Sequence, residues 1–239
     1  MVGAAAAAEA AQTWALLSLL SPVLNPPSPF RGTIEDRIMY TRFPTDQWWN
    51  AKAGSPVRVT DFNVWQGASA VWRGLFQDGA FVPGTGFPVL VIRIIRDDTY
   101  FQHPDPGPYD LPAGFDLYYD DPVRDVRLVV LFDRCTHLCC YPGWHVVSDP
   151  PPGRDYATYG ASPPTYEVYQ QDPVYCLCHG AQYDPLLLAA DVNPKNDVPY
   201  VGARVVYGPA THAMPIVPIR AVSDVLKGGM ANPAWYVYC

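Results

Sequence analysis

Two short stretches of the chain concentrate the side chains that could bind a metal. The stretch CTHLCC covers Cys135–Cys140 and the stretch CLCHG covers Cys176–Gly180, and together they hold five of the six cysteines in the chain. Cysteines grouped in this way bind metals or form disulfides. A Cys2His2 zinc finger usually places both cysteines first and both histidines second. Here each stretch offers one cysteine and one histidine in close succession, so the ligands are divided between two loops.

An iron–sulfur cluster accounts for this division better than zinc does. In one type of [2Fe–2S] centre, two histidines replace two cysteines on one of the two irons. One iron then has two thiolate ligands and the other has two imidazole ligands. Because neutral imidazoles carry less negative charge than thiolates, such a cluster is easier to reduce, with potentials of about −150 to +300 mV.

The stretches CTHLCC and CLCHGAQYDP resemble the motifs of the Rieske iron–sulfur subunit of cytochrome bc-type quinol-oxidising complexes. The family pattern is CTHLGC followed by CPCHGS, and the resemblance is strongest from about residue 126 to residue 211. It implies that Cys135 and Cys176 bind one iron of a Rieske [2Fe–2S] cluster and that His137 and His179 bind the other.

The same resemblance assigns roles to the residues around the ligands. It implies a disulfide between Cys140 and Cys178 that ties the two loops together. Leu138 matches a leucine beside the exposed histidines, where quinol docks. Tyr183 matches a tyrosine that donates a hydrogen bond to a cysteine sulfur, which stabilises the reduced cluster. The stretch GPAT resembles a family loop that covers the cluster, which would consist here of Gly208, Pro209 and Ala210.

Three features depart from the family pattern. Ala181 replaces a serine, so one hydroxyl that could donate to sulfur is missing and a lower potential is expected. Cys139 replaces a glycine, which would strain the backbone if the site requires a positive φ. The adjacent pair Cys139–Cys140 also leaves open which of the two forms the disulfide. A Pro/Tyr-rich insertion, residues 141–169, separates the loops and is either a surface loop or a docking surface.

The rest of the composition favours a mainly β protein. The chain has 239 residues, 49% of them hydrophobic, and its 27 prolines disfavour a helical bundle. Runs rich in β-branched and aromatic residues predict strands. They are Val57–Phe62, Pro88–Ile95, Val126–Phe132, Ala203–Gly208 and Ala234–Tyr238. The resemblance implies a Rieske-type antiparallel β-sandwich or set of sheets with an inserted cluster-binding subdomain.

The chain is expected to divide into four parts. Residues 1–24 are expected to form an N-terminal helix, which is either a docking helix or a membrane anchor. Residues 25–56 are expected to form a proline-rich linker and neck. Residues 57–132 and 212–239 would form a β base domain, and residues 133–211 the cluster-binding subdomain. Trp48, Trp49, Tyr118 and Tyr119 are expected to be packing residues.

The remaining histidines and the last cysteine are expected to lie outside the cluster site. His103, His145 and His212 are interpreted as ordinary surface residues. Cys239 ends the chain and is either a free thiol or a partner for Cys139.

The resemblance implies an oxidoreductase subunit of the quinol–cytochrome c reductase type. Quinol would give a proton to His179 or His137, while electrons would go to the cluster and to a cytochrome b-type partner. A cytochrome c-like or copper protein would be the acceptor. A disulfide requires an oxidising compartment, which indicates the extracytoplasmic face of the cytoplasmic membrane. The net charge of −7 argues against a nucleic-acid partner.

Two other functions fit parts of the sequence. The chain could be the small Rieske subunit of a molybdenum oxidase such as arsenite oxidase, which can share the cysteine pair. It could also be a non-enzymatic extracellular interaction domain that zinc holds together. Visible absorption of the purified protein separates the zinc alternative from both iron–sulfur alternatives.

Overall fold

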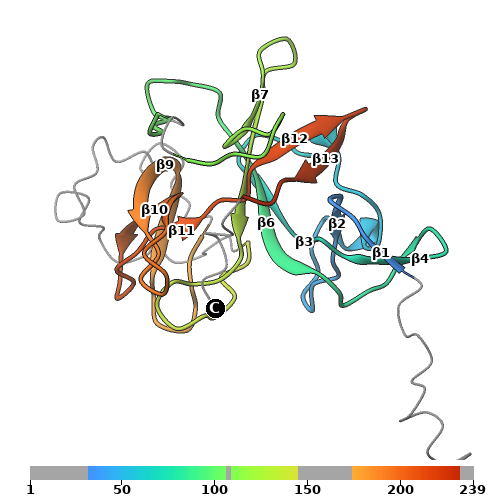
Figure 1. The fold of residues 1–239 in the computed structure, drawn as a ribbon, viewed down its shortest axis with the longest axis horizontal. Helices are drawn as coiled ribbons and strands as arrows, with labels where there is room; N and C mark the ends of the chain where they lie inside the picture. The colour runs from blue at the N-terminus through green and yellow to red at the C-terminus, as the bar shows by residue number, and fades with distance from the viewer. Residues whose placement is uncertain (1–31, 106–108, 145–173, 232–239) are drawn as a thin grey trace, which may run out of the picture.

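The computed structural model describes residues 32–105, 109–144 and 174–231 (Figure 1). Strands make up 43% of the structure and helices 4%, and the sheets are antiparallel, so the expected mainly β class is confirmed. The predicted N-terminal helix, the strand predicted at Ala234–Tyr238 and most of the insertion lie outside the described residues. Within the described ranges, no helix is both long and apolar enough to cross a membrane.

The largest sheet has five antiparallel strands in the order β2-β3-β6-β8-β7. Two of them, β6 and β8, coincide with predicted β-branched runs. Every residue of β8 is buried, which indicates that protein covers both faces of this strand. The bounds are β2 (Ile38–Tyr40), β3 (Gln66–Trp72), β6 (Phe87–Ile94), β7 (Tyr119–Asp121) and β8 (Val126–Phe132).

A second sheet, of three strands, lies beside the first and appears at the left of Figure 1. Its order is β11-β10-β9, and β10 includes most of the predicted strand at Ala203–Gly208. The pairing of β9 with β10 shifts register twice, at Ala203/Arg204 and at Val205/Tyr207. The bounds are β9 (Gln182–Val192), β10 (Pro199–Tyr207) and β11 (Met214–Pro215).

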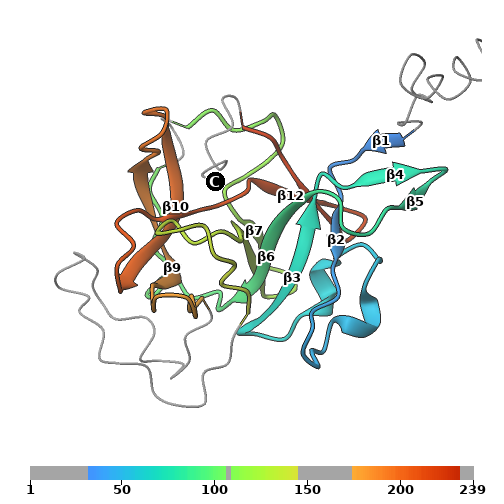
Figure 2. The same ribbon diagram turned by 90° about the horizontal axis from the view of Figure 1, so that it is seen from below.

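Two small sheets complete the described fold. One consists of β1 (Gly32–Ile34), β4 (Leu75–Gln77) and β5 (Ala80–Phe81), and the other of β12 (Ile219–Val222) and β13 (Val225–Gly228). The span expected to be linker and neck contains three elements of this fold, namely β1, β2 and the 3-10 helix η1 (Asn50–Lys52). Residues 32–56 are therefore built into the folded body (Figure 2).

The strand predicted at Val57–Phe62 is wrong. Residues Val59–Asp61 form a 3-10 helix, η2, and the chain makes only an isolated bridge, between Arg58 and Val225. The cause is local, because the Asp61 carboxylate accepts the Arg58 backbone N–H at 3.1 Å and the Asp61 N–H bonds back to the Arg58 carbonyl at 3.1 Å. This reciprocal capping closes a turn that a strand cannot contain.

The two larger sheets are joined by the segment that follows β11. Ile216 donates its N–H to Val201 of β10 at 3.0 Å, and Val217 donates to Val130 of β8 at 2.8 Å. One short segment is thus hydrogen-bonded to both sheets. This link matters because β8 leads into the first Cys/His loop, whereas β9 begins directly after the second.

The aromatic pairs singled out in the sequence are packing residues, as predicted. Trp49 is fully buried, and its ring meets the Trp48 ring edge to face at 5.9 Å. Trp48 packs in the same way on Phe62 at 5.2 Å. Tyr118 contacts Phe101 with a centroid distance of 4.8 Å. These contacts lie outside the two Cys/His loops.

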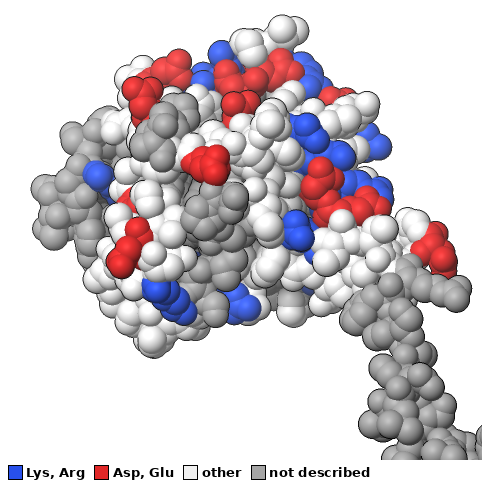
Figure 3. Space-filling view, in the orientation of Figure 1, with Lys and Arg blue, Asp and Glu red and all other residues white. Residues whose placement is uncertain are grey.

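Charged side chains of both signs are interspersed over the molecular face in Figure 3. Among the described residues on that face, lysine and arginine form no continuous basic area. Many basic groups are paired locally, as Arg127 is with Asp98 and Asp120.

Candidate metal centre

The two Cys/His loops have the same backbone hydrogen-bond pattern. In the first loop, Cys135 donates its N–H to the Cys140 carbonyl and accepts the Cys139 N–H at its own carbonyl, both at 2.8 Å. In the second loop, Cys176 makes the equivalent bonds to Ala181 at 2.8 Å and from Gly180 at 2.9 Å. Each loop is therefore a six-residue turn that begins with a free cysteine.

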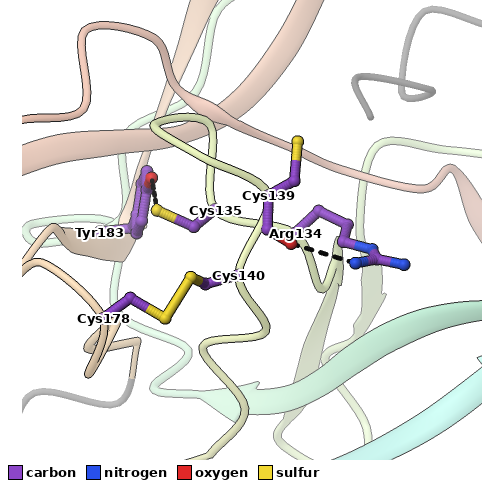
Figure 4. The surroundings of a disulfide bond; sticks show 6 residues. All are labelled: Arg134, Cys135, Cys139, Cys140, Cys178 and Tyr183. Atoms are coloured by element: carbon purple, nitrogen blue, oxygen red, sulfur yellow. Dashed lines mark hydrogen bonds between the residues drawn. A yellow bond between two sulfur atoms is a disulfide. The ribbon is translucent and has the colours of Figure 1, made fainter.

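The fifth residue of each turn has a left-handed backbone. Gly180 has a φ of 79° and Cys139 has a φ of 61°. A residue with a Cβ atom is strained in this region, whereas glycine is not. The strain anticipated for cysteine at this position is thus present in the first loop. The Arg134 guanidinium donates to the Cys139 carbonyl at 3.0 Å and helps to hold the turn (Figure 4).

A disulfide joins the sixth residue of the first turn to the third residue of the second turn. It links Cys140 to Cys178, with a Cα–Cα distance of 6.6 Å, and so the predicted pairing is confirmed. The Cys139 side chain points away from this bond (Figure 4). Cys139 is itself disulfide-bonded, while Cys239, its partner in one of the sequence expectations, lies outside the described residues.

Cys135 and Cys176 are the free cysteines among the described residues, and both are buried. The two thiols are close enough for each to change the pKa of the other. The neighbouring Cys176 sulfur lowers the pKa of Cys135, with help from the Tyr183 hydroxyl, and the Cys135 sulfur raises the pKa of Cys176. Among the described residues, a hydroxyl contact is seen at the Cys135 sulfur, from Tyr183.

Nearby backbone N–H groups also lower the pKa of both sulfurs. The donors stand two and three residues after the cysteine in each loop, and their hydrogen bonds favour the thiolate over the thiol. They belong to His137 and Leu138 in the first loop and to Cys178 and His179 in the second. Both loops are therefore arranged to stabilise negative charge on sulfur, as a metal ligand requires.

The two histidines form a second pair. The imidazole rings of His137 and His179 lie 4.8 Å apart between centroids and are nearly perpendicular, at 89°. The Nδ1 atom of His137 is buried and has no hydrogen-bond partner, although a buried polar atom normally has one. His179 is exposed. A metal ion bound by the imidazole nitrogens would remove the cost of the unpartnered atom.

The donor set fits the two irons of a mixed-ligand cluster. One pair of buried free thiols and one pair of adjacent imidazoles are present, and each loop contributes one member of each pair. The sulfurs of Cys140, Cys176 and Cys178 also lie within 4.8 Å of one another. Two of these three form the disulfide, so only Cys176 can act as a thiolate ligand.

Tyr183 lies on β9 with its hydroxyl beside the Cys135 sulfur. The hydroxyl is 3.1 Å from the Cys135 sulfur (Figure 4) and 3.0 Å from both the backbone nitrogen and the hydroxyl oxygen of Thr136. Burial raises the pKa of Tyr183, with a smaller effect from the nearby Cys135 sulfur, so the phenol keeps its proton. Ala181, in the second loop, has no side-chain donor.

The loop that contains Gly208 contacts the second turn. A Cβ atom at Gly208 would lie 2.6 Å from both the Ala181 Cα and the Gly180 carbonyl oxygen, and its φ is 91°. Only glycine allows this approach. Within the same loop, Pro209 is exposed and Ala210 is buried. The expected covering loop is thus packed on the second Cys/His loop.

Two leucines give the site an apolar rim. Leu138, expected beside the histidines, is 61% exposed, and Leu177, which the sequence analysis did not single out, is 68% exposed. Leu177 occupies the position of a proline in the family pattern, and this departure could have drawn attention to it. Thr136, buried against Tyr183, was also missed, because nothing in the sequence places it beside that hydroxyl.

The other histidines have roles away from the sulfurs. His103 is exposed and its Nε2 atom lies 3.2 Å from the Tyr118 hydroxyl. The Nδ1 atom of His212 lies 3.2 Å from Asp191. His145 lies outside the described residues.

A scan of the chain against protein-family models found no match, and no curated protein matched it.

Proposed function

We propose that Cys135, His137, Cys176 and His179 bind a Rieske-type [2Fe–2S] cluster. The observation that carries this proposal is the pairing of two buried free thiols and two imidazoles across loops that a disulfide joins. Neither a purely structural disulfide nor a surface histidine pair requires that combination. When bound, the cluster would supply one-electron redox chemistry at a potential raised by its histidine ligands.

The protein residues would set the charge and the access of this site. The backbone N–H groups and Tyr183 stabilise thiolate sulfur on the first iron. Burial of Cys135 and Cys176 keeps water from that side. On the other side, the exposed His179 imidazole and the Leu138 side chain face solvent. The site is therefore accessible from the histidine side.

This asymmetry supports quinol as the electron donor. The outward ring nitrogen of His179 would accept a hydrogen bond from a quinol hydroxyl and then hold its proton. Histidine suits this task because its pKa lies near neutral pH. Leu138 would contact the apolar part of the quinol, and His137 would complete the exposed pair.

The chain would then be an electron-transfer subunit of a respiratory, quinol-oxidising membrane complex. A cytochrome b-type subunit would be its partner, and a cytochrome c-like or copper protein would accept its electrons. The disulfide supports an oxidising compartment, so we place the domain at the extracytoplasmic face of the cytoplasmic membrane.

The test is to purify the full chain and to measure iron, acid-labile sulfide, visible absorption and EPR. We expect two irons and two sulfides per chain and an EPR signal of mixed His/Cys ligation. His137→Ser and His179→Ser should each abolish that signal, while the control His103→Ser should retain it. A zinc-containing, colourless protein, or an unchanged EPR signal in His137→Ser, would contradict the cluster.

Copurification from the native membrane tests the complex. A cytochrome b-type subunit is the expected partner, together with quinol-dependent reduction of the cluster. A molybdenum-containing subunit in its place would contradict quinol oxidation while leaving the cluster assignment intact.

A further inference from the structure

The hydroxyl of Tyr183 lies within hydrogen-bond distance of three polar atoms, but it has a single proton to donate. Its oxygen accepts the backbone N–H of Thr136 at 3.0 Å. The hydroxyl also lies 3.1 Å from the Cys135 sulfur and 3.0 Å from the Thr136 hydroxyl oxygen. A phenol has one proton to donate, so the sulfur and the threonine oxygen are alternative acceptors unless Thr136 is itself the donor.

The His212 carbonyl determines whether Thr136 or Tyr183 is the donor in the hydrogen bond between their hydroxyls. It lies 2.6 Å from the Thr136 hydroxyl, and because a carbonyl can only accept, Thr136 must donate its proton there. Thr136 then has only lone pairs to offer Tyr183. The proton of Tyr183 is thus available to two acceptors, the ligand sulfur and the threonine oxygen.

We propose that Thr136 is a positioning residue that lowers the reduction potential of the cluster by competing with the Cys135 sulfur for the Tyr183 proton. The inference rests on the proposed function, since it requires a redox cluster on Cys135. It goes beyond the proposed function, because the presence of a cluster does not by itself say whether Thr136 raises or lowers the reduction potential.

The direction follows from the change in charge at sulfur. Reduction makes the ligand sulfur a stronger acceptor, so a hydrogen bond to it stabilises the reduced state more than the oxidised state. When a second acceptor is available, the Tyr183 proton can move to Thr136 in the oxidised state, where the sulfur is the weaker acceptor. The alternative hydrogen bond stabilises the oxidised state. Tyr183 then stabilises the reduced state over the oxidised state by a smaller free energy, and the reduction potential is lower. Removing the competing oxygen should therefore raise the potential.

The second loop has no hydroxyl at the equivalent position. Its equivalent of Thr136 is Leu177, which has no hydroxyl and is exposed. The competition is consequently confined to the first loop, where β9 and the His212 segment enclose Thr136.

The test compares midpoint potentials by protein-film voltammetry of the cluster-loaded full chain. Thr136→Val keeps the shape and the backbone N–H that holds Tyr183, but it removes the hydroxyl. We expect its reduction equilibrium to shift about threefold toward the reduced state, or about 28 mV upward at 59 mV per tenfold change. Thr136→Ser, which keeps the hydroxyl, should stay close to the wild-type potential.

A double variant separates competition from a structural effect. In the Tyr183→Phe background there is no shared proton, so Thr136→Val should leave the potential unchanged. If Thr136→Val does not fold, Thr136→Ala provides the same comparison. An unchanged or lower potential in the Val or Ala variant, or an equal rise in the Tyr183→Phe background, would overturn the inference.

Metal analysis of the wild-type protein distinguishes this failure from a failure of the proposed function. A wild type without iron and sulfide would overturn the cluster, and with it the role of Thr136. A loaded wild type whose potential does not respond to Thr136 overturns only the competition.

Discussion

The two Cys/His loops are alike in backbone and different in surroundings. Both are six-residue turns closed by the same pair of hydrogen bonds, and both have a left-handed fifth residue. In the first loop the residue after Cys135, Thr136, is buried and bonded to Tyr183 and to the His212 carbonyl. In the second loop the equivalent residue, Leu177, is exposed.

This difference suggests a division of roles. The repeated backbone turn begins with a free cysteine in each loop, but the histidine is the third residue of the first turn, His137, and the fourth residue of the second, His179. In the first loop, neighbouring segments enclose Thr136, so this side chain can adjust the charge on the Cys135 sulfur through Tyr183. The second loop carries the more exposed histidine, His179, which in the proposed function is the residue that contacts quinol. Four sets of variants test this comparison, beginning with the largest expected effect.

Removal of the disulfide should affect both loops most. Cys178→Ser, like Cys140→Ser, removes a cross-link that spans 38 residues. We expect it to lower the free energy of unfolding by about 2–4 kcal/mol and to accelerate cluster loss. Chemical denaturation and the decay of visible absorption measure the two effects. A variant with wild-type stability and cluster lifetime would mean that the surrounding sheets alone hold the loops together.

The left-handed positions should show the same preference for glycine in both loops. Gly180→Ala should lower the free energy of unfolding by about 1 kcal/mol, because alanine is strained at positive φ. The nearest side chain to the added Cβ is the Tyr175 hydroxyl at 3.6 Å, so steric overlap is not the cause.

In the first loop, the matched comparison is Cys139→Gly against Cys139→Ala. Both variants lack the Cys139 disulfide, so their difference isolates the backbone. We expect Cys139→Gly to be more stable by about 1 kcal/mol in chemical denaturation. Equal stabilities would show that the Arg134 contact, rather than the φ preference, controls this turn. Mass spectrometry of a non-reduced digest of the wild type would identify the partner of Cys139, for which the sequence suggests Cys239.

Loss of the Tyr183 hydroxyl should change the potential without loss of the cluster. Tyr183→Phe removes the donor to Cys135, so we expect the midpoint to fall by tens of millivolts. About 1 kcal/mol of differential stabilisation corresponds to roughly 40 mV for one electron. Quinol oxidation should slow in parallel. Protein-film voltammetry at one pH measures the shift, and an unchanged or higher midpoint would leave Tyr183 as a packing residue.

A hydroxyl added to the second loop should have the smallest effect. Ala181→Ser restores a donor that the family pattern contains, and we expect the midpoint to rise by less than Tyr183→Phe lowers it. Ala181 is fully buried and contacts Gly208, which limits the rotamers open to the new hydroxyl. Ala181→Val is the control, because it adds volume without a donor and should not raise the midpoint. A rise in both variants would assign the effect to packing.

Parts of this fold could be predicted because their cause is local. The runs that form β6 and β8 consist mostly of β-branched and other apolar residues, which favour buried strands. The strand β3 was missed, because the stretch Gly67–Ala70 is made of small residues with weak strand preference. It is a strand because β2 and β6 lie on either side of it and bond to it. Val59–Asp61 was mistaken for strand, because apolar content outweighed the capping carboxylate of Asp61.

For the candidate site, the sequence by itself determined which donor atoms are present and how they divide between two loops. The order and spacing of cysteine and histidine in a motif can be recognised without knowing the rest of the chain. The disulfide of Cys140 and Cys178 could therefore be predicted from the resemblance, and the structure confirms it. The tertiary structure decided what surrounds each donor. Thr136 and His212 are 76 residues apart, and only the packing of the His212 segment against the first loop makes the Thr136 hydroxyl a donor to that carbonyl. Hydrogen-bond direction depends on distance and on the competing partners, neither of which is encoded by residue spacing.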